Sequence, residues 1–355
     1  MKTLSFGCIS MTILALTSCG GRQQTVQTES QSQEQPVKII FETDMGNDVD
    51  DALAYDMLMR YVDEGKVELL GVSSNKRNEG STQYIDALAT WYGHPDIPIG
   101  AVQDGVPCDD AVDYAQATID MKDADGNPLF SQTHANDGFI VPSVQMYRDL
   151  LAKAPDTSVT VVSVGFSTNL AQLLDSEADD ISPLSGKELV AKKVKTLVTM
   201  AGNFTNNNEA DSLKRMQEYN VVRDVAAAQK VFAEWPTPIV TSPFEIGIDI
   251  CYPASSIDTE YTKANIHPAV EAYKVYLPMP YDRPTWDLTS VLYAVEGPDG
   301  YFTLSEPGDI IVEQRGSTRF VPNQEGTRFV LLCNSQQKEN ILNHFIEMIP
   351  YYPTK

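Results

Sequence analysis

The stretch from Val37 to Ala54, VKIIFETDMGNDVDDALA, joins a continuous apolar run to a turn crowded with acids. Residues 37–43 have the length and apolar content of a buried strand, and residues 50–65 repeat apolar side chains at helical spacing. The ten residues from Glu42 to Asp51, where these two patterns meet, include five carboxylates. A strand, a turn and a helix in this order begin a parallel βαβ unit, and they place the acids at the carboxyl end of the strand.

Strand-like and helical patterns alternate through the rest of the chain. Segments of helical period separate apolar runs of strand length, which recur at 67–74, 158–165, 194–202 and 238–244. A helix over 285–297, short strands that look antiparallel and a last helix over 336–348 complete the chain. Such alternation is typical of a parallel sheet covered on both faces. We therefore predict an α/β fold, a single large domain over 37–355 with a mostly parallel central sheet flanked by helices and short antiparallel additions near the C-terminus.

The composition excludes one class of partner. The 355 residues include 26 Lys and Arg against 49 Asp and Glu, a net charge of −23. Binding to nucleic-acid polymers requires clustered basic side chains that neutralise phosphates, so we expect no such polymer as partner. The acidic excess is either solvated surface or a set of carboxylates gathered around a metal, and composition alone fits both. A homo-oligomer is compatible with it as well.

The first 36 residues resemble an export signal followed by a linker. Lys2 precedes a short apolar run, and residues 16–20, LTSCG, resemble a bacterial lipobox in which Cys19 becomes the lipid attachment residue. An ordinary secretory signal with an incidental cysteine is the alternative. Residues 1–18 are thus predicted to be a lipoprotein signal peptide, and the polar, Gln-rich residues 19–36 a flexible tether. These features predict a location in the bacterial cell envelope, with membrane contact through the N-terminal lipid only.

The acidic turn has two physical interpretations. Carboxylate oxygens are the ligands that a hard cation such as Ca²⁺ prefers. Acids at a helix N-terminus also favour the helix dipole, which accounts for Asp50 and Asp51 but not for Asp44 and Asp48. An EF-hand loop is excluded, because the sixth position from Asp44 is Val49 where that loop needs Gly. Metal binding therefore explains the acids better than capping alone.

Six segments resemble a known family in the order in which that family carries them. The turn Glu42-Thr43-Asp44-Met45-Gly46, followed by Asp50-Asp51-Ala52, resembles the signature of the inosine/uridine-preferring nucleoside hydrolases. The later segments that resemble the family are Gly71–Asn75, Gly165–Leu170, Met200–Asn203, Glu218–Asn220 and Asp287. The resemblance covers roughly residues 37–350.

The resemblance implies a nucleoside hydrolase-like domain that hydrolyses the N-glycosidic bond of ribonucleosides with Ca²⁺ as cofactor. By the same resemblance, Asp44 is the catalytic base that activates a water, and the metal ligands are Asp44, Asp51, Asp287 and the backbone carbonyl of Thr168. The resemblance also implies a set of substrate-binding residues, which includes a histidine and a tryptophan near the base. These residues are Asp50, Asn75, Asn203, Glu218, Asn220, His134 and Trp286.

Several of these polar residues also have structural interpretations. Asn75 could be a turn residue, and Asn78 competes for its role. Asn203 lies in an Asn-rich run that is typical of a solvated loop. Glu218 and Asn220 precede a predicted helix over 224–235 and could serve only as caps. His134, which aligns with a family His-Gly turn, could equally be a loop histidine.

The chain departs from the family pattern at three points. Met45 replaces a proline, and two extra residues lengthen the turn before Asp50, so that Asp48 could replace one aspartate of the pair or lie behind it. Trp286 occupies the position before Asp287 where many members carry a histidine. Because an indole cannot deliver a proton at neutral pH, protonation of the leaving base must come from elsewhere, or the base must stack on an aromatic ring and leave with help from water. Tyr281, Asp282 and Arg283 are further candidates for the pocket wall.

Three functions remain open from the sequence. The first is a Ca²⁺-dependent hydrolase acting on a small-molecule nucleoside. The second is a lipid-anchored nucleoside- or sugar-binding protein with weak or no turnover, which Trp286 and the altered turn favour. The third is a hydrolase of another glycoside. Asp44 and Asp287 favour catalysis, since binding alone needs no base beside a water.

Overall fold

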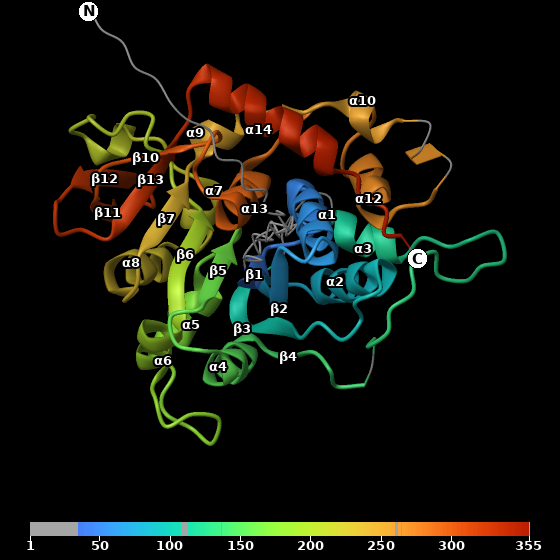
Figure 1. Ribbon diagram of the computed structural model, residues 1–355, viewed down its shortest axis with the longest axis horizontal. Coiled ribbons are helices and arrows are strands. Elements are labelled where there is room, and N and C mark those ends of the chain that lie inside the picture. Colours follow the sequence, from blue (N-terminus) through green and yellow to red (C-terminus); the bar gives the residue numbers. More distant parts are fainter. Residues whose placement is uncertain (1–34, 108–112, 136, 260–261, 264, 355) are drawn as a thin grey trace, which may run out of the picture. The chain divides into compact units, whose positions relative to one another are not determined.

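The computed structural model describes residues 35–107, 113–135, 137–259, 262–263 and 265–354. The predicted signal peptide, tether and lipid attachment at Cys19 lie outside the described residues. An eleven-stranded sheet forms the centre of the domain (Figure 1). Ten strands lie side by side in the order β12-β11-β13-β7-β6-β5-β1-β2-β3-β4, and the eleventh, β10, pairs with β13. Within the part of the chain described, no helix has the length and apolar character needed to cross a membrane.

The strands of this sheet alternate along the chain with helices, as the sequence predicts. The parallel part consists of β1 (Val37–Thr43), β2 (Val67–Arg77), β3 (Ile99–Pro107), β4 (Val141–Pro142), β5 (Val159–Ser163), β6 (Val194–Met200) and β7 (Ile239–Ser242). The C-terminal strands are β10 (Thr303–Leu304), β11 (Gly308–Val312), β12 (Thr318–Pro322) and β13 (Arg328–Leu332). A separate antiparallel pair joins β8 (Cys251–Tyr252) to β9 (Arg283–Pro284).

The C-terminal strands confirm the predicted antiparallel additions and add one detail. Strand β11 pairs antiparallel with β12 and with β13. Strand β13 also pairs parallel with β7, so it extends the parallel part of the sheet. A mostly parallel sheet with antiparallel strands near the C-terminus is therefore the observed fold class.

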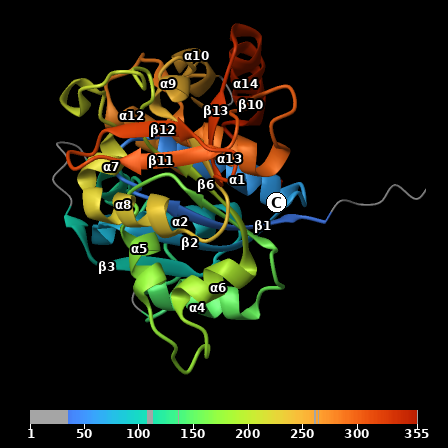
Figure 2. The ribbon, with the colours of Figure 1, turned by 90° about the vertical axis from the view of Figure 1, so that its left-hand side faces the viewer.

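Helices cover both faces of the sheet (Figure 2). The core on one face includes residues of α1 (Asp50–Asp63), α2 (Glu79–Tyr92), α3 (Tyr114–Ile119), α12 (Pro268–Tyr276), α13 (Trp286–Glu296) and α14 (Ser335–Met348). The core on the other face includes residues of α4 (Ser143–Lys153), α5 (Thr168–Asp175), α6 (Gly186–Lys193) and α8 (Val225–Glu234). Shorter helices are α7 (Tyr219–Arg223), α9 (Phe244–Gly247), α10 (Ala254–Ile257) and the 3-10 turn η1 (Ser212–Lys214).

Strand β1 shows why its sequence reads as a continuous apolar run. Ile39 and Phe41 point into the core on one face, and Ile40 points into the core on the other. Successive side chains of a strand point to opposite faces, so a strand buried on both faces needs apolar residues at every position. Strand β1 is therefore a central strand, and it pairs in parallel with β2 on one side and β5 on the other.

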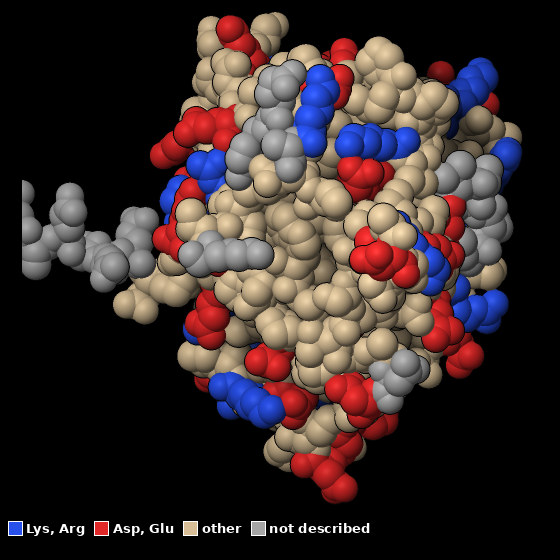
Figure 3. Space-filling view, turned by 90° about the vertical axis from the view of Figure 1, so that its right-hand side faces the viewer, with Lys and Arg blue, Asp and Glu red and all other residues tan. Residues whose placement is uncertain are grey.

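Most acids of the chain are not in this interior. On the face drawn in Figure 3, acidic and basic side chains are both scattered over the surface rather than gathered by sign. Dispersed surface carboxylates keep a domain soluble and need no ligand. The buried acids are therefore the exceptions that call for a physical explanation.

Candidate functional site

The order of the strands creates a switch point beside β1. The chain leaves β1 toward β2, β3 and β4 on one side, and returns to β5, β6 and β7 on the other. In open parallel sheets, helices on either side of such a point leave a crevice at the carboxyl ends of the strands, where ligands bind. A cavity of about 280 Å³ lies here, and its lining includes Asp44 just after β1, Val164 just after β5 and Met200 at the end of β6.

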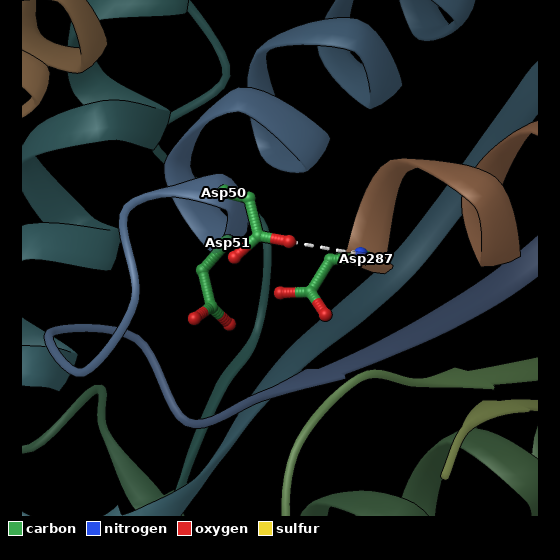
Figure 4. Close-up of side chains that lie close together, drawn as sticks. All are labelled: Asp50, Asp51 and Asp287. Atoms are coloured by element: carbon green, nitrogen blue, oxygen red, sulfur yellow. Dashed lines mark hydrogen bonds between the residues drawn. The ribbon is translucent and has the colours of Figure 1, made fainter. Parts of the chain in front are cut away.

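Three buried carboxylates meet at one side of this cavity (Figure 4). Asp50 and Asp51 belong to the first turn of α1, and Asp287 belongs to the first turn of α13. One oxygen of each lies within 4.8 Å of the others. The backbone N–H of Asp287 donates to Asp50 Oδ2 at 3.0 Å and ties the two helix ends together. We call these residues the aspartate trio.

The electrostatics of the aspartate trio call for a cation. Burial raises the pKa of all three carboxyls well above its usual range, and the charges of neighbouring aspartates raise it further. The Oδ1 atom of Asp51 accepts a hydrogen bond from the Thr43 hydroxyl, whereas its buried Oδ2 has no hydrogen-bond partner among the described residues. Buried carboxylates of this kind are stable when they coordinate a metal or bind protons, so the donor set fits a hard cation.

Asp44 lies in the same cavity but outside the tight trio. Its carboxylate is 2% exposed, and Asn47 Nδ2 donates to its Oδ2 at 3.3 Å. Its charge contributes to the raised pKa of Asp51 and of Asp287, after the larger effect of burial. Asp44 and the aspartate trio therefore line the same cavity, and a ligand in this cavity would lie beside all four carboxylates.

The structure gives Asp48 a role that the sequence left open. Arg283, on β9, donates from Nε to Asp48 Oδ1 at 2.8 Å and forms a second bond to Oδ2. Asp48 lines the cavity as well, but the guanidinium occupies both of its oxygens. The two extra residues of the turn therefore place an ion pair beside the trio rather than another free carboxylate.

The turn itself is fixed by small contacts. The Thr43 hydroxyl accepts a hydrogen bond from Met45 N at 3.0 Å, and Met45, in place of the family proline, is fully buried against the Tyr114 hydroxyl. Gly46 has a φ of +105°, and a Cβ atom there would lie 2.9 Å from Asp113 Oδ1. The turn therefore needs a glycine at this position.

Glu218 is a helix cap, one of the two roles considered for it, whereas the Asn220 side chain caps no helix; binding of sugar hydroxyls by the two residues stays a prediction. Glu218 caps α7, where it accepts from Asn220 N at 2.7 Å and from Gly202 N at 3.0 Å. Asn220 Nδ2 donates to the carbonyls of Val164 at 3.0 Å and Met200 at 3.1 Å. Both residues line the cavity, and burial raises the pKa of Glu218 to about 7.

Two asparagines from the sequence prediction do not line the cavity. Asn75, on β2, is buried beneath it and donates to Glu42 Oε1 at 3.2 Å. Its competitor Asn78 caps α2 and also bonds Asp113. Asn203 holds its own turn, because its Oδ1 accepts from Thr205 N at 3.1 Å and its N–H donates to Thr318 at 2.9 Å. Local hydrogen bonds thus account for Asn203 and for the Nδ2 of Asn75, whereas the buried Oδ1 of Asn75 has no hydrogen-bond partner among the described residues.

Thr168 and His134 also lie away from the cavity lining. Thr168 is the first residue of α5, and its hydroxyl donates to Asp224 Oδ2 at 2.7 Å. Val164, four residues earlier, reaches the cavity because it directly follows β5. The His134 ring stacks on Phe139 with centroids 3.7 Å apart, and its Nδ1 is 2.7 Å from an oxygen of Asp137, whose hydrogen bond raises the histidine pKa.

Aromatic rings form the other side of the cavity. Trp286 lines it as predicted, and its Nε1 donates to the Phe244 carbonyl at 3.0 Å while the two rings stack with centroids 5.5 Å apart. Tyr219 and Tyr276 line the cavity too. We call Tyr219, Phe244, Tyr276 and Trp286 the aromatic wall. Three of its members were not singled out in the sequence, where isolated aromatic residues carry no recognisable pattern.

The other residues proposed for the wall have different contacts. Tyr281 stacks on Tyr273 with centroids 4.3 Å apart and donates to the Tyr273 carbonyl. Asp282 accepts from Ala254 N at 2.9 Å, before α10. Neither lines the cavity. Arg283 lies behind the wall, with its guanidinium carbon 5.0 Å from the Tyr276 ring centroid and 5.4 Å from that of Trp286.

A buried glutamate lies beneath the cavity and provides a test by pH. Glu42 accepts from the Tyr147 hydroxyl at 2.6 Å and from Asn75, and burial raises its pKa from 4.5 to about 7. The folded protein therefore binds a proton that the unfolded chain releases above pH 4.5. This contribution to stability is present below pH 4.5 and is lost as the pH rises to about 7.

We expect Glu42→Gln to remove this dependence. In the absence of metal, the free energy of unfolding of the native chain should fall by about 3 kcal/mol more than that of the variant as the pH rises through this window. Urea unfolding from pH 4.5 to pH 7.5 measures the difference, with Glu68→Gln as the control because Glu68 is an exposed partner of Lys38. If the free energy of unfolding fell equally with pH for the native chain and for Glu42→Gln, Glu42 would not be the group that binds this proton.

Taken together, the doubly wound sheet and the acidic cavity at its switch point define an α/β enzyme fold whose site is assembled around buried aspartates. The chain belongs to the inosine-uridine preferring nucleoside hydrolase family, whose model matches residues 39–341. Members of this family are N-glycosyl hydrolases, and the chain is an enzyme of that class. A search among curated protein sequences finds no match.

Solved structures share this fold. A purine-preferring ribonucleoside hydrolase from Gardnerella vaginalis is 18% identical, with a TM-score of 0.63 over 88% of this chain and 98% of that one. An inosine-uridine preferring nucleoside hydrolase from Bacillus anthracis is 19% identical, with a TM-score of 0.61 over 88% of this chain and all of that one. A plant nucleoside hydrolase is 18% identical, with a TM-score of 0.61 over 88% and 98% of the two chains.

Proposed function

We propose that this protein hydrolyses the N-glycosidic bond of ribonucleosides in a Ca²⁺-dependent reaction that releases ribose and the free base. The observation that carries the proposal is the aspartate trio with Asp44 beside it, in a cavity at the switch point of the sheet. Family membership supports the reaction class, and the all-oxygen character of the donors supports a hard cation.

The residues divide into metal ligands and ribose contacts. Asp44, Asp51 and Asp287 are the proposed carboxylate ligands. Asp50, whose Oδ2 accepts the Asp287 N–H, is assigned to a ribose hydroxyl, as the family resemblance implies. Val164 lines the cavity where Thr168 does not, so we assign the backbone carbonyl ligand to Val164 instead. A Ca²⁺ ion bound here offsets the repulsion among the aspartates and lowers the pKa of a nearby water.

The chain itself supplies the remaining steps. Asp44 takes a proton from the attacking water, which adds to the ribose C1′ as the bond to the base breaks. Both electrons of that bond go to the base, and a neutral base then takes a proton from water. Glu218 and Asn220, fixed at the start of α7 by their own backbone contacts, bind ribose hydroxyls and hold C1′ in place. Positioning by such fixed groups lowers the barrier by several kcal/mol.

The direct test is ribose release from a panel of nucleosides, before and after removal of metal. We expect release from at least one nucleoside, a loss of at least about 100-fold on treatment with EDTA, and recovery with added Ca²⁺ because the carboxylates repel one another without it. Tight nucleoside binding without release from any member of the panel would contradict the proposal and favour a binding protein. Activity unchanged by EDTA would contradict the proposed Ca²⁺ dependence.

A further inference from the structure

Every charged side chain that lines the cavity, among the described residues, is acidic. The six are Asp44, Asp48, Asp50, Asp51, Glu218 and Asp287. Arg283 pairs with Asp48, and a divalent metal would offset two more charges, so negative charge still exceeds positive charge in the site. A cavity with such a surplus concentrates positively charged ligands and disfavours negatively charged ones.

The aromatic wall has an affinity for positive charge as well. Aromatic faces attract cations within about 6 Å of the ring centroid, and they stack with planar rings. The wall already binds one cation, because Arg283 lies over both Tyr276 and Trp286. Trp286 is fixed by its bond to the Phe244 carbonyl, so the Trp286–Phe244 pair is preorganised for a flat ligand.

The cavity is poorly equipped to protonate a leaving group. Trp286 occupies the position before Asp287, its N–H is engaged by Phe244, and an indole is no acid at neutral pH. No histidine, lysine or cysteine is among the described residues that line the cavity. Burial raises the pKa of Glu218 to about 7, but both of its oxygens already accept hydrogen bonds from backbone N–H groups, and a proton on either oxygen would displace one of these bonds. A neutral base leaves readily only if it gains a proton, whereas a cationic base leaves without one.

We propose that the preferred substrates are ribosides whose base is a positively charged, planar heteroaromatic ring, of the N-ribosyl-pyridinium type. The proposal rests on the riboside hydrolysis proposed above. The bond between C1′ and the ring nitrogen breaks with both electrons going to nitrogen, so the ring leaves as a neutral molecule. Water adds to C1′ and gives its proton to Asp44. No group needs to protonate the base.

The first test compares kcat/KM for nicotinamide riboside, inosine and uridine on the full chain with Ca²⁺, each divided by its uncatalysed rate. We expect the quotient for nicotinamide riboside to be the highest. A higher quotient for inosine or uridine would overturn the inference while leaving riboside hydrolysis intact. Release from none of the three would instead contradict the proposed function, so the two failures are distinguishable.

The second test separates charge from shape by binding. Asp44→Asn, which lacks the base, is titrated with nicotinamide riboside and with dihydronicotinamide riboside, whose ring is neutral and of nearly the same size. We expect at least tenfold tighter binding of the cation. Equal affinities would overturn recognition of the charge.

The third test concerns Trp286. Trp286→His restores an acid beside the leaving group, and we expect it to raise the rate on inosine at least tenfold relative to that on nicotinamide riboside. Trp286→Phe, the matched control, keeps a ring without adding an acid and should leave the ratio within about threefold of the native value. If Trp286→His left the ratio of the inosine rate to the nicotinamide riboside rate unchanged, the claim that Trp286 deprives the site of an acid for the leaving base would be wrong.

Discussion

Replacing Asp44 with Asn should lower kcat/KM for ribose release by about 10³- to 10⁴-fold, the range expected when a positioned general base is lost. The carboxylate is buried in the cavity, follows directly on β1 and lies close enough to the aspartate trio to raise the pKa of Asp51. Asn has nearly the same shape and can still accept a hydrogen bond from Asn47, but it cannot take a proton from water. The loss should therefore fall on kcat more than on KM.

The measurement is steady-state ribose release at saturating Ca²⁺ with the best substrate of the panel. Asp149→Asn is the matched control, because it makes the same chemical change at an exposed carboxylate that pairs with Lys153 on α4. Circular dichroism on both variants checks that the fold is retained. If Asp44→Asn kept more than a tenth of the native activity, Asp44 would not be the base.

Replacing Asp51 with Asn should have opposite effects on stability with and without metal. Without metal, we expect the variant to be more stable than the native chain at pH 7 by at least about 1 kcal/mol, since one of several mutually repelling buried charges is gone. Its side-chain oxygen can still accept from Thr43. With Ca²⁺, the native chain should be the more stable one, because the ion binds a charged ligand set more tightly.

Thermal unfolding in EDTA and in excess Ca²⁺ tests this reversal. The native chain should show a rise in Tm with Ca²⁺, and Asp51→Asn should show little or none, with calcium affinity reduced at least about 100-fold. Asp63→Asn, at the last position of the same helix, serves as the control: it weakens the contacts of Asp63 with His94 and Tyr351 with or without metal, so its rise in Tm with Ca²⁺ should equal that of the native chain. If Asp51→Asn were less stable than the native chain in EDTA, repulsion among the buried aspartates would not be the dominant effect. If its Tm rose with Ca²⁺ as much as that of the native chain, Asp51 would not be a calcium ligand.

The fold was predictable because its signals are local. The apolar run of β1 and the helical spacing of α1 depend on neighbours within a few residues, and the same periods recur in β2, β5, β6 and β7. The strands β3 and β4 escaped detection because β3 contains glycines and polar residues and β4 is only two residues long. Short or mixed segments carry too few positions to define a period.

The site was predictable in part, for a related reason. Asp50 and Asp51 follow from the start of α1, and the match of Asp287 to a family motif placed it, and Trp286 directly before it, at the cavity. Asn75 and Asn203 matched their motifs equally well, but their side chains are held by Glu42 and by the turn at Thr205. Whether an asparagine faces a cavity or satisfies a nearby backbone group depends on side-chain packing, which a motif does not specify.

The sequence by itself determined the strand, the acidic turn and the helix that follows, since hydrophobic period and helix-start chemistry act within one or two turns of chain. Only the tertiary structure decided which acids act together. Packing of α13 against α1 brings Asp287 to Asp50, and β9 brings Arg283 to Asp48, pairs separated by 237 and 235 residues. The physical reason is that burial and Coulomb interaction depend on distance in space. What packs against each of the five acids of this turn therefore decides which become part of a candidate metal site, which forms an ion pair and which is a buried glutamate with a raised pKa.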